Sequence, residues 1–570
     1  MSQNIFILPE NVINKIAAGE VVQRPSSALK ELLENSIDAG AKEIEIEILE
    51  GGKTFLLIRD DGFGMSKDDA ILSVERHATS KIKNFEDLQK LNSFGFRGEA
   101  LASIASVSQF EIKTKTKNDS VGFEIKINGG NVLSKNEISS PIGTTIIVKN
   151  LFFNTPARKE FLKTTSTEFR SCYDVITQIA LSHPEIKLKF TSNNELLLNL
   201  KSEDLASRIE SIYGEKIIST LLPVKSENDY LKISGFISKP DFARKAKKEQ
   251  YIFLNNRFIL SPAIQHAVYN GYEHLVEKGS YHFFVLNIDI ASDKIDVNIH
   301  PSKLNAKFSD DQIVYQTVFH SVRNALSKSN LIPNLNFSET DKVNFNSEIK
   351  SIFAQKNIFN DFGVIESSQR NEIQNVKIQN SDKKYLGSLE NKFLIFQNSD
   401  GIMIVDQHVA HERILYEKFT ERFSLRKPES QQLLFPITLN FNPSDFSILM
   451  DIKNELEIIG FQFKEFGKFT IMLEAIPTEI KIGKESKILQ SVIDEFKLNI
   501  QKENIVITDN LAKSLSCKAA IKAGDELTFS EIEKLIDELF KSKLPYVCPH
   551  GRPVIINISV NELNKRFLRI

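Results

Sequence analysis

Three side chains in the C-terminal third have the types and spacing of ligands for a divalent cation. Asp406 follows an apolar stretch, His408 lies two residues later, and Glu412 lies one helical turn beyond His408. Carboxylate oxygens and an imidazole nitrogen placed in this way can converge on one metal ion. The alternative is a charged helix start that Asp406 caps. Cys548 and His550 can add a thiolate and a second imidazole, and a buried, inert thiol is the alternative for Cys548.

A second set, near the N-terminus, has the types and spacing to bind a nucleotide. Asp60 ends an apolar stretch, and Gly62 and Gly64 follow it in the pattern D-x-G-x-G. A carboxylate in this position can accept a hydrogen bond from an exocyclic amine, and the glycines let the backbone approach a flat ring. Gly95 and Gly98 precede a helical stretch, where backbone N–H groups can cradle phosphates. Taken singly, a tight turn or a flexible loop explains each motif about as well.

The stretch from residue 25 to residue 40 has the period of an amphipathic helix. Pro25 and Ser26 are suited to its N-terminal cap, and Gly40 is suited to its end. Glu31 and Asn35 lie one turn apart on its polar side, which is an ordinary solvated face when considered alone. The apolar side must face a core, and it carries Leu29, Leu32, Leu33 and Ile37.

Strands are expected before and around these motifs. Glutamate and isoleucine alternate over residues 43–48, which is the period of a half-buried strand. Apolar and β-branched residues predict further strands that lead into Asp60 and Asp406. The other expected strands cover residues 55–59, 146–148, 253–259, 283–290, 393–396 and 401–405, and a helical stretch covers residues 264–276.

Length and composition limit the class of protein. A chain of 570 residues is too long for one core and predicts three or four domains. The net charge of -2 means that a surface for nucleic acid must be a local patch. Three cysteines exclude a disulfide scaffold and fit a reducing compartment. The N-terminus has no basic segment followed by an apolar one, and no run of 18 apolar residues occurs, so we predict a soluble, cytoplasmic protein.

Four motifs in one order resemble a known ATPase superfamily. E-x-x-x-N, D-x-G-x-G, G-F-R-G-E-A-L and G-T-T occur in the order found in gyrase, histidine kinases, the large heat-shock chaperones and MutL. Three longer strings, I-A-A-G-E-V-V at 16–22, R-H-A-T-S-K at 76–81 and F-N-T-P-A-R at 153–158, resemble the MutL family of mismatch-repair proteins. The resemblance implies an ATPase that binds ATP and Mg²⁺.

The resemblance assigns roles to individual residues. It makes Glu31 the general base that orients water on the γ-phosphate, Asn35 the Mg²⁺ ligand and Asp60 the reader of adenine. Asp61 stands where many relatives have asparagine, and we expect this change to alter only the local hydrogen bonding. The residues implied to bind the nucleotide are Asn35, Asp60, Gly64, Thr79, Ser80, Lys81, Gly95, Phe96, Arg97, Gly98, Thr145 and Lys303.

Domain limits follow from the same comparison and from composition. We expect an ATPase domain at 1–205, a transducer domain at 206–330, a polar linker at 331–384 and a C-terminal domain at 385–570. The string I-D-V-N-I-H-P-S-K in the transducer implies that Lys303 reaches the γ-phosphate, although the continuation L-N-A-K-F departs from the family pattern. The expected fold class is α/β with α+β parts: a Bergerat-type ATPase sandwich, a β-α transducer and an α+β C-terminal domain.

The C-terminal motifs resemble those of endonuclease-type MutL proteins. The family signature D-Q-H-A-x-x-E-x-x-x-x-E is met except that Val409 replaces alanine. It implies a two-metal site that nicks DNA, with Zn²⁺ or Mn²⁺ as the metal, and with Asp406 and Glu412 as catalytic residues. Cys517 is expected to be a neighbour of the site. The implied metal ligands are Asp406, His408, Glu412, Cys548 and His550.

The resemblance covers nearly the whole chain and predicts an ATP-dependent mismatch-repair protein that dimerises and nicks DNA. Expected partners are DNA bound without sequence preference, the mismatch-recognition protein MutS and a sliding clamp. Gln431 to Pro436 resemble the clamp-binding element, and a short apolar strand explains them about as well. Arg158, Lys159 and Lys163 are candidate DNA contacts, with a solvated basic helix as the alternative. The alternative function is a matchmaker that does not cut; a topoisomerase or kinase would need a cleavage tyrosine or phospho-acceptor histidine domain that we do not find.

Overall fold

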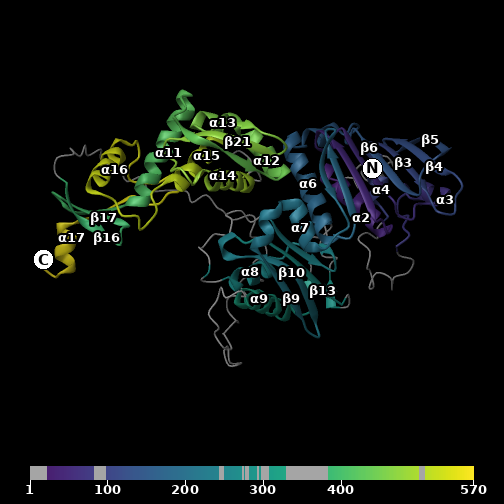
Figure 1. Cartoon of the computed structure of the whole chain (residues 1–570), viewed down its shortest axis with the longest axis horizontal. Helices are drawn as coiled ribbons and strands as arrows, with labels where there is room; N and C mark the ends of the chain where they lie inside the picture. Colours follow the sequence, from purple (N-terminus) through teal and green to yellow (C-terminus); the bar gives the residue numbers. More distant parts are fainter. Residues whose placement is uncertain are drawn as a thin grey trace, which may run out of the picture. The chain divides into compact units, whose positions relative to one another are not determined.

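The computed structural model describes most of the chain as two compact units (Figure 1). One unit comprises residues 1–335 with 442–447, and the other comprises residues 336–441 with 448–570. Gly95, Phe96, Arg97, Lys303 and nearly all of the expected linker lie outside the described residues. Within the described part no helix is long and apolar enough to cross a membrane. The described residues are 22–81, 98–242, 249–272, 275, 281–291, 294–296, 307–328, 383–499 and 507–569.

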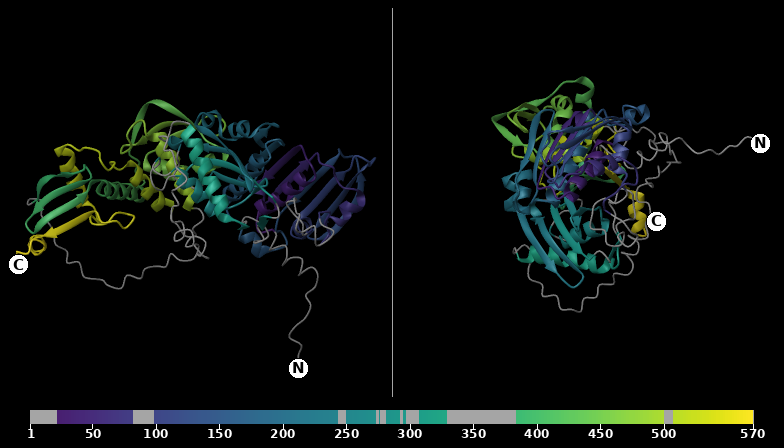
Figure 2. Two further views of the ribbon diagram at one scale, coloured as in Figure 1. Left: turned by 90° about the horizontal axis from the view of Figure 1, so that it is seen from below. Right: turned by 90° about the vertical axis from the view of Figure 1, so that its right-hand side faces the viewer.

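An eight-stranded sheet forms the centre of the first part of the chain, and its strands lie side by side in Figure 2. Their order is β5-β4-β3-β6-β2-β1-β7-β8, with β1 antiparallel to β2 and parallel to β7. The strands are β1 (Glu43–Leu49), β2 (Phe55–Asp60), β3 (Gln109–Lys115), β4 (Gly122–Asn128), β5 (Asn131–Ile138), β6 (Gly143–Lys149), β7 (Lys187–Ser192) and β8 (Glu195–Leu200).

Helices pack on one face of this sheet because its strands alternate in polarity. The isoleucines of β1 are fully buried and its glutamates lie on the other face, as their alternation predicts. Helix α2 buries its leucines in the same core. The helices of this part are α2 (Pro25–Asp38), α3 (Lys67–Leu72), α4 (Ala100–Ser106), α5 (Pro156–Glu160), α6 (Thr165–Ser182) and α7 (Leu205–Tyr213).

The two ends of α2 differ in how well they were predicted. Gly40 has a φ of 71°, and its N–H donates to the carbonyl of Ile37, so glycine ends the helix as expected. The prediction that Pro25 and Ser26 form the cap was wrong, because Arg24 is the N-cap residue and no side chain caps the helix. Pro25 instead occupies the first turn, where its missing N–H costs nothing.

A five-stranded sheet follows, with the order β12-β11-β13-β10-β9. Its strands are β9 (Leu221–Glu227), β10 (Leu231–Ser238), β11 (Gln250–Leu254), β12 (Arg257–Phe258) and β13 (Phe284–Ile290), and a short pair, β14 (Ile295–Asp296) and β15 (Lys307–Phe308), lies beyond them. Helices α8 (Pro262–Gly271) and α9 (Asp311–Lys328) pack on each other and bury a separate core against this sheet. This β-rich part with two helices agrees with the expected transducer architecture.

The C-terminal part contains two sheets and a long helix, α11 (Gln407–Leu425). One sheet has the order β16-β17-β18-β22, with β16 (Lys384–Leu389), β17 (Phe393–Asn398), β18 (Gly401–Asp406) and β22 (Ile555–Ser559). The other has the order β19-β21-β20, with β19 (Ser430–Asn440), β20 (Gln462–Glu465) and β21 (Thr470–Pro477). The remaining helices are α12 (Pro443–Asp451), α13 (Lys453–Ile459), α14 (Glu485–Asn499), α15 (Ile507–Ala519), α16 (Phe529–Lys541) and α17 (Val560–Arg566).

Candidate functional site

Helix α2 and the segment 79–81 meet at the polar side of the helix. Lys81 Nζ donates to Asn35 Oδ1 at 3.1 Å and forms an ion pair with Asp38. Glu31 and Asn35 are both half-buried, one turn apart on this side. The side-chain amide oxygen of Asn35 therefore faces a position that already holds a positive charge. A Mg²⁺ ligand needs such a position.

Asp60 closes the end of β2 and is held in one orientation by two donors. Ser36 Oγ of α2 donates to Oδ2 at 3.0 Å, and the Gly62 N–H donates to Oδ1 at 3.0 Å. Burial raises the pKa of the Asp60 carboxyl above its usual value, and the hydrogen bond from the Gly62 N–H opposes the rise. A carboxylate that is buried, oriented and next to a glycine turn can read the exocyclic amine of a base.

Strand register separates the two threonines of the G-T-T motif. Thr144 of β6 lies directly opposite Asp60, whereas Thr145 lies opposite Arg59 and so faces the other side of the sheet. Thr144 Oγ1 is 3.1 Å from Thr114 Oγ1 on the Asp60 side. Thr145, the residue expected to bind the nucleotide, therefore points away from the face that carries Asp60, because successive side chains of a strand point to opposite faces. Thr144 is the threonine that shares the face of Asp60.

Two glycines allow backbones to pass closely beside Asp60 and the segment 79–81. A Cβ on Gly64, whose φ is 70°, would lie 2.1 Å from the Lys115 carbonyl oxygen. A Cβ on Gly98, whose φ is 62°, would lie 2.3 Å from the Ala78 carbonyl oxygen, and the His77 N–H donates to the Gly98 carbonyl. Gly98, the second glycine of G-F-R-G-E-A-L, therefore lies directly beside the R-H-A-T-S-K segment.

The Asp61 carboxylate accepts hydrogen bonds from the backbone at the start of β1. Its Oδ1 accepts from the backbone N–H groups of Lys42 at 2.7 Å and Glu43 at 2.9 Å. These contacts tie the glycine turn to the start of β1. That the change from asparagine at this position alters only the local hydrogen bonding stays a prediction.

Three potential metal ligands converge in the C-terminal unit. Glu412, Cys548 and His550 each offer a ligand atom, and these atoms lie within 4.8 Å of one another. Glu412 Oε1 lies 2.5 Å from His550 Nδ1, and both Glu412 and Cys548 are buried. The backbone N–H groups of His550 and Arg552 each donate to the Cys548 sulfur at 3.3 Å, which fixes the thiol in its turn. A carboxylate, a thiol and an imidazole form a donor set suited to Zn²⁺.

Asp406 and His408 lie outside this three-residue group. Asp406 Oδ1 accepts from the N–H groups of His408 and Val409, so Asp406 caps α11, which was the alternative to metal binding. His408 donates from Nδ1 to the Ile521 carbonyl at 2.7 Å, because a carbonyl can only accept. A hydrogen bond with Cys517 raises the pKa of His408 to about 8, aided by the Ile521 carbonyl. Cys517 is thus a direct neighbour of His408.

Two residues that support this centre were not singled out from the sequence. Gln407 is fully buried, and its Nε2 donates to the carbonyls of Asn391 and Asp525. His411 Nδ1 accepts from the Ile521 N–H at 3.0 Å, and burial lowers its pKa to about 4. Together with His408 they hold the loop after α15 against α11. The glutamine of the D-Q-H signature was the available signal, whereas no local pattern marks His411.

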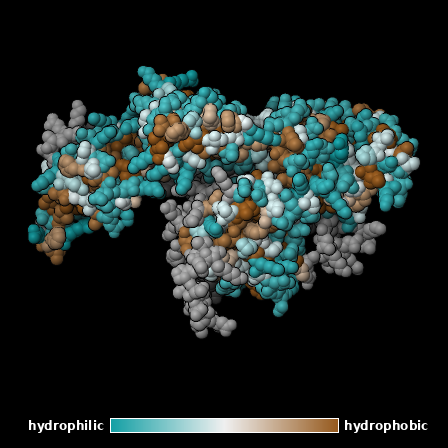
Figure 3. All heavy atoms as spheres, in the orientation of Figure 1, coloured by the Kyte–Doolittle hydropathy of each residue, from teal (hydrophilic) through white to brown (hydrophobic). Residues whose placement is uncertain are grey.

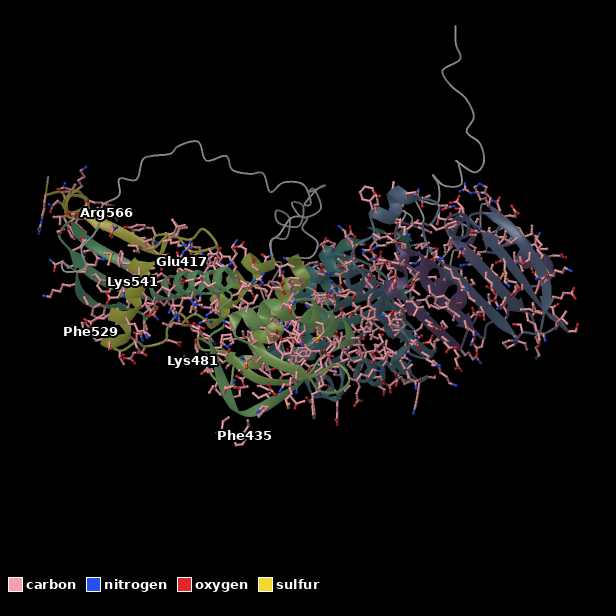
Figure 4. The ribbon with its side chains drawn as sticks, turned by 90° about the horizontal axis from the view of Figure 1, so that it is seen from above. Glu417, Phe435, Lys481, Phe529, Lys541 and Arg566 are labelled. Atoms are coloured by element: carbon pink, nitrogen blue, oxygen red, sulfur yellow. The ribbon has the colours of Figure 1, made fainter. Side chains whose placement is uncertain are left out.

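The segment from Gln431 to Pro436 is paired with its sheet only at Gln431 and Gln432. The pairing of β19 with β21 is interrupted between Gln432 and Ile437, while Gln431 Nε2 donates to the carbonyls of Pro477 and Ile480. Leu434 and Phe435 are 87% and 78% exposed, and Figure 4 shows Phe435 projecting from the ribbon. The segment lies within a strand, as the alternative stated; Leu433 is buried, whereas Leu434 and Phe435 face outward.

The sheet β16-β17-β18-β22 has apolar side chains on both faces. Leu394, Val405 and Ile555 form a cross-strand row that is buried in a core shared with α11 and α16. The opposite face has the row Ile395, Ile404 and Ile556, of which Ile556 is 54% exposed. Figure 3 shows hydrophobic surface over this part of the chain. A second apolar face on a sheet is a typical subunit interface.

Family models match three segments of the chain. The histidine kinase, DNA gyrase B and HSP90-like ATPase matches residues 23–150, the DNA mismatch repair protein C-terminal domain matches 209–327, and the MutL C-terminal dimerisation domain matches 386–527. Fold and site thus define an ATPase of the histidine kinase, DNA gyrase B and HSP90 type, joined to a dimerisation domain.

Whole-length relatives identify the family. DNA mismatch repair protein MutL of Chlorobium phaeobacteroides is 39% identical over 99% of each chain, and that of Pelodictyon phaeoclathratiforme is 38% identical over the same shares. The chain therefore belongs to the MutL family of DNA mismatch-repair proteins. Among solved structures, the Aquifex aeolicus MutL ATPase domain complexed with ADP is 25% identical, covering 52% of this chain and 98% of that one, with a TM-score of 0.37.

Membership of this family makes the protein a homodimer through its C-terminal domain, and we expect the outer face of β16-β17-β18-β22 to form the interface. Ile404→Asp is expected to raise the dimer dissociation constant by at least about 100-fold, since a two-fold interface buries the new charge twice. Analytical ultracentrifugation of the full chain measures this change. Ile482→Asp is the control, because Ile482 is 69% exposed and lies between β21 and α14, outside this sheet. Unchanged dimerisation in Ile404→Asp would place the interface elsewhere.

Proposed function

We propose that this protein is a conformational switch driven by ATP, which couples mismatch recognition to metal-dependent nicking of DNA by its C-terminal domain. The observation that carries the nicking proposal is the convergence of Glu412, Cys548 and His550 from segments about 136 residues apart. Burying a carboxylate beside a thiol is costly without a shared cation, and the exposed imidazole of His550 completes the donor set. ATPase activity itself follows from the family.

In the ATPase half, the side chains around α2 have separate tasks. Glu31 orients and deprotonates the attacking water, and Asn35 holds Mg²⁺ through its amide oxygen. Asp60 and Thr144 recognise the base from the end of the sheet. Thr79, Ser80, Lys81 and Gly98 surround the phosphates together with Gly95, Phe96 and Arg97, and Lys303 reports the γ-phosphate. Because these groups come from different segments, ATP binding would order them into one closed state.

In the C-terminal half, Glu412, Cys548 and His550 would hold a Zn²⁺ or Mn²⁺ ion, with His408 and Asp406 as further ligands. A bound metal would supply Lewis acidity toward the phosphate and a water of lowered pKa. His408 donates through Nδ1 to the Ile521 carbonyl. In the tautomer with the proton on Nδ1, the other ring nitrogen, Nε2, can bind the metal. Asp406 orients the start of α11, on which His408 and Glu412 lie.

Partners follow from the proposed task. DNA would be bound through local basic groups without sequence preference, so its affinity should fall steeply with salt. MutS would deliver the mismatch signal to the ATP-bound dimer. A sliding clamp would bind the segment from Gln431 to Pro436, whose exposed Leu434 and Phe435 suit an apolar pocket.

Clamp binding is expected to depend on those two side chains. Leu434→Ser combined with Phe435→Ser should weaken binding to the purified sliding clamp at least about tenfold, since two apolar anchors are lost. Surface plasmon resonance with the full chain measures it. Phe466→Ser is the matched control, because Phe466 is 57% exposed and lies between β20 and β21 of the same sheet. Equal binding by the double variant would leave the segment as an ordinary exposed strand.

The nicking proposal is tested with supercoiled plasmid, Mn²⁺ and the full chain, with and without ATP. Nicked circles should form with the wild-type chain and be lost in Asp406→Asn, which keeps the helix cap but removes the charge. The alternative, a matchmaker that binds ATP and partners without cutting, predicts no nicking by either protein.

A further inference from the structure

The hairpin formed by β11 and β12 ends in a turn of fixed conformation. Asn255 and Asn256 form this turn, and their φ angles of 49° and 63° fit the two-residue turn that joins twisted antiparallel strands. The Asn255 side chain donates from Nδ2 to the Ile290 carbonyl at 2.8 Å, and its Oδ1 accepts from the Ile290 N–H at 2.9 Å. Because these bonds tie the turn to the end of β13, the hairpin moves with its five-stranded sheet as one body.

The tip of this hairpin lies against two helices of the preceding part of the chain. Asn256, Arg257 and Phe258 line a cavity together with residues of α2 and α6, and α6 also packs against β12. Lys30 and Glu34 are the residues of α2 in this lining. The cavity has a volume of about 20 Å³, which holds about one water molecule, so the three elements are in close contact and leave no room for a ligand.

An apolar core continues from the hairpin to α2. Phe253 of β11 is fully buried in the cluster that contains the leucines of α2, and the half-buried Phe258 packs against this cluster. The two rings meet edge to face, with their centroids 6.0 Å apart. The ring of Tyr251 also contacts Phe258, and its hydroxyl shares a hydrogen bond of 2.8 Å with the hydroxyl of Tyr213 on α7. Closely packed interiors transmit displacements, so a shift of the hairpin is passed on to α2.

The flank of α2 that the hairpin supports borders its catalytic side. Successive residues of an α-helix are about 100° apart around its axis, which places Lys30 and Glu34 within about 100° of Glu31. Glu34 is only 5% exposed, and its Oε1 lies 3.8 Å from Lys30 Nζ. A general base must point at its water, and a misplacement of about 1 Å can cost about 100-fold in rate. The rotation and depth of α2 therefore matter for hydrolysis.

We propose that the β11–β12 hairpin holds α2 in the position that ATP hydrolysis requires, with Phe258 as a positioning residue that acts through Glu31. This inference rests on the proposed role of Glu31 as the general base, and it adds a residue that no motif of the nucleotide site contains. It also gives the five-stranded sheet a route to the ATPase site that is separate from Lys303.

Phe258→Ala is expected to lower the turnover number for ATP hydrolysis about tenfold while ATP affinity changes less than about twofold, because the lost ring lets α2 shift and leaves Asp60 in place. Phe258→Leu should restore most of the turnover, since leucine refills the apolar site. Single-turnover hydrolysis by the full chain in excess over ATP measures the rate. Equilibrium binding of a fluorescent ATP analogue measures the affinity.

A double variant shows whether Phe258 acts through Glu31. In a Glu31→Gln chain the base is absent, so adding Phe258→Ala should lower the remaining rate less than about twofold. A further loss of about tenfold in this chain overturns the action through Glu31. Unchanged turnover in the single variant Phe258→Ala overturns the positioning role itself. Wild-type turnover in Glu31→Gln overturns the proposed base, and with it the route through Glu31.

Phe319→Ala is the matched control. Phe319 is a half-buried phenylalanine of α9 that packs against the separate core of the five-stranded sheet. Its loss should lower the thermal stability of the full chain to a similar extent but leave turnover unchanged, and thermal unfolding shows that both variants are folded. Equal losses of turnover in Phe258→Ala and Phe319→Ala would reduce the effect to general stability and overturn the positioning role.

Discussion

Glu31→Ala is expected to lower the turnover number for ATP hydrolysis at least about 100-fold while leaving ATP affinity within a few-fold. General-base catalysis contributes roughly this factor or more, and the carboxylate acts on water, so it adds little to nucleotide binding. Glu31 is held in place because the leucines on the other side of α2 are fully buried. Steady-state hydrolysis and equilibrium binding of a fluorescent ATP analogue measure the two quantities separately.

Two further variants separate the role of Glu31 from general damage to α2. Glu31→Gln keeps the size of the side chain and should lose hydrolysis to the same extent. Asn35→Ala should instead lose the Mg²⁺-dependent part of ATP binding, since Asn35 Oδ1 faces a position that already holds the Lys81 ammonium. Wild-type turnover in Glu31→Ala would remove the base assignment, whatever the result for Asn35.

Glu412→Gln and Cys548→Ser are expected to lose the bound metal and at least about 100-fold of the nicking rate, with ATP hydrolysis unchanged. Both side chains are buried beside His550, and replacing one charged or thiolate donor leaves too few strong ligands within 4.8 Å. Metal content by elemental analysis of the purified chain gives a readout that does not depend on activity. The plasmid assay then reports the chemistry.

Cys172→Ser is the matched control for the cysteine variant. Cys172 lies on α6 and is fully buried in the core, 3.6 Å from the Gly51 carbonyl oxygen, and its substitution should change neither metal content nor nicking. Full metal occupancy in Cys548→Ser would show that the three groups meet for packing. Metal loss without loss of nicking would instead show that the metal at this site is structural and that nicking does not depend on it.

Elements with local periodicity were predicted well. The 3.6-residue spacing of leucines and the glycine at position 40 define α2, and alternation of glutamate and isoleucine defines β1, because both patterns reflect interactions between near neighbours in the chain. The order of the short motifs indicated the family, and the family models and relatives confirm it. The fold class was confirmed in the same way, while the domain limits and site roles remain predictions.

Features that depend on register and long-range contact were decided only by the tertiary structure. No local pattern could choose Thr144 over Thr145, because the choice depends on which residue of β6 pairs with Asp60. The cap of α2 was misassigned for a local reason, since Pro25 fits the first turn and Arg24 takes the cap position.

The sequence by itself determined the chemistry available to this protein, namely the side chains that can bind ATP and a metal ion and the helices and strands that carry them. Only the tertiary structure decided which of those side chains meet. Glu412, Cys548 and His550 come together while Asp406 serves α11 as a cap, and Gln407 and His411 hold the adjoining loop. The physical reason is that the local sequence pattern indicates where helices and strands occur, whereas sites form where distant segments pack against one another.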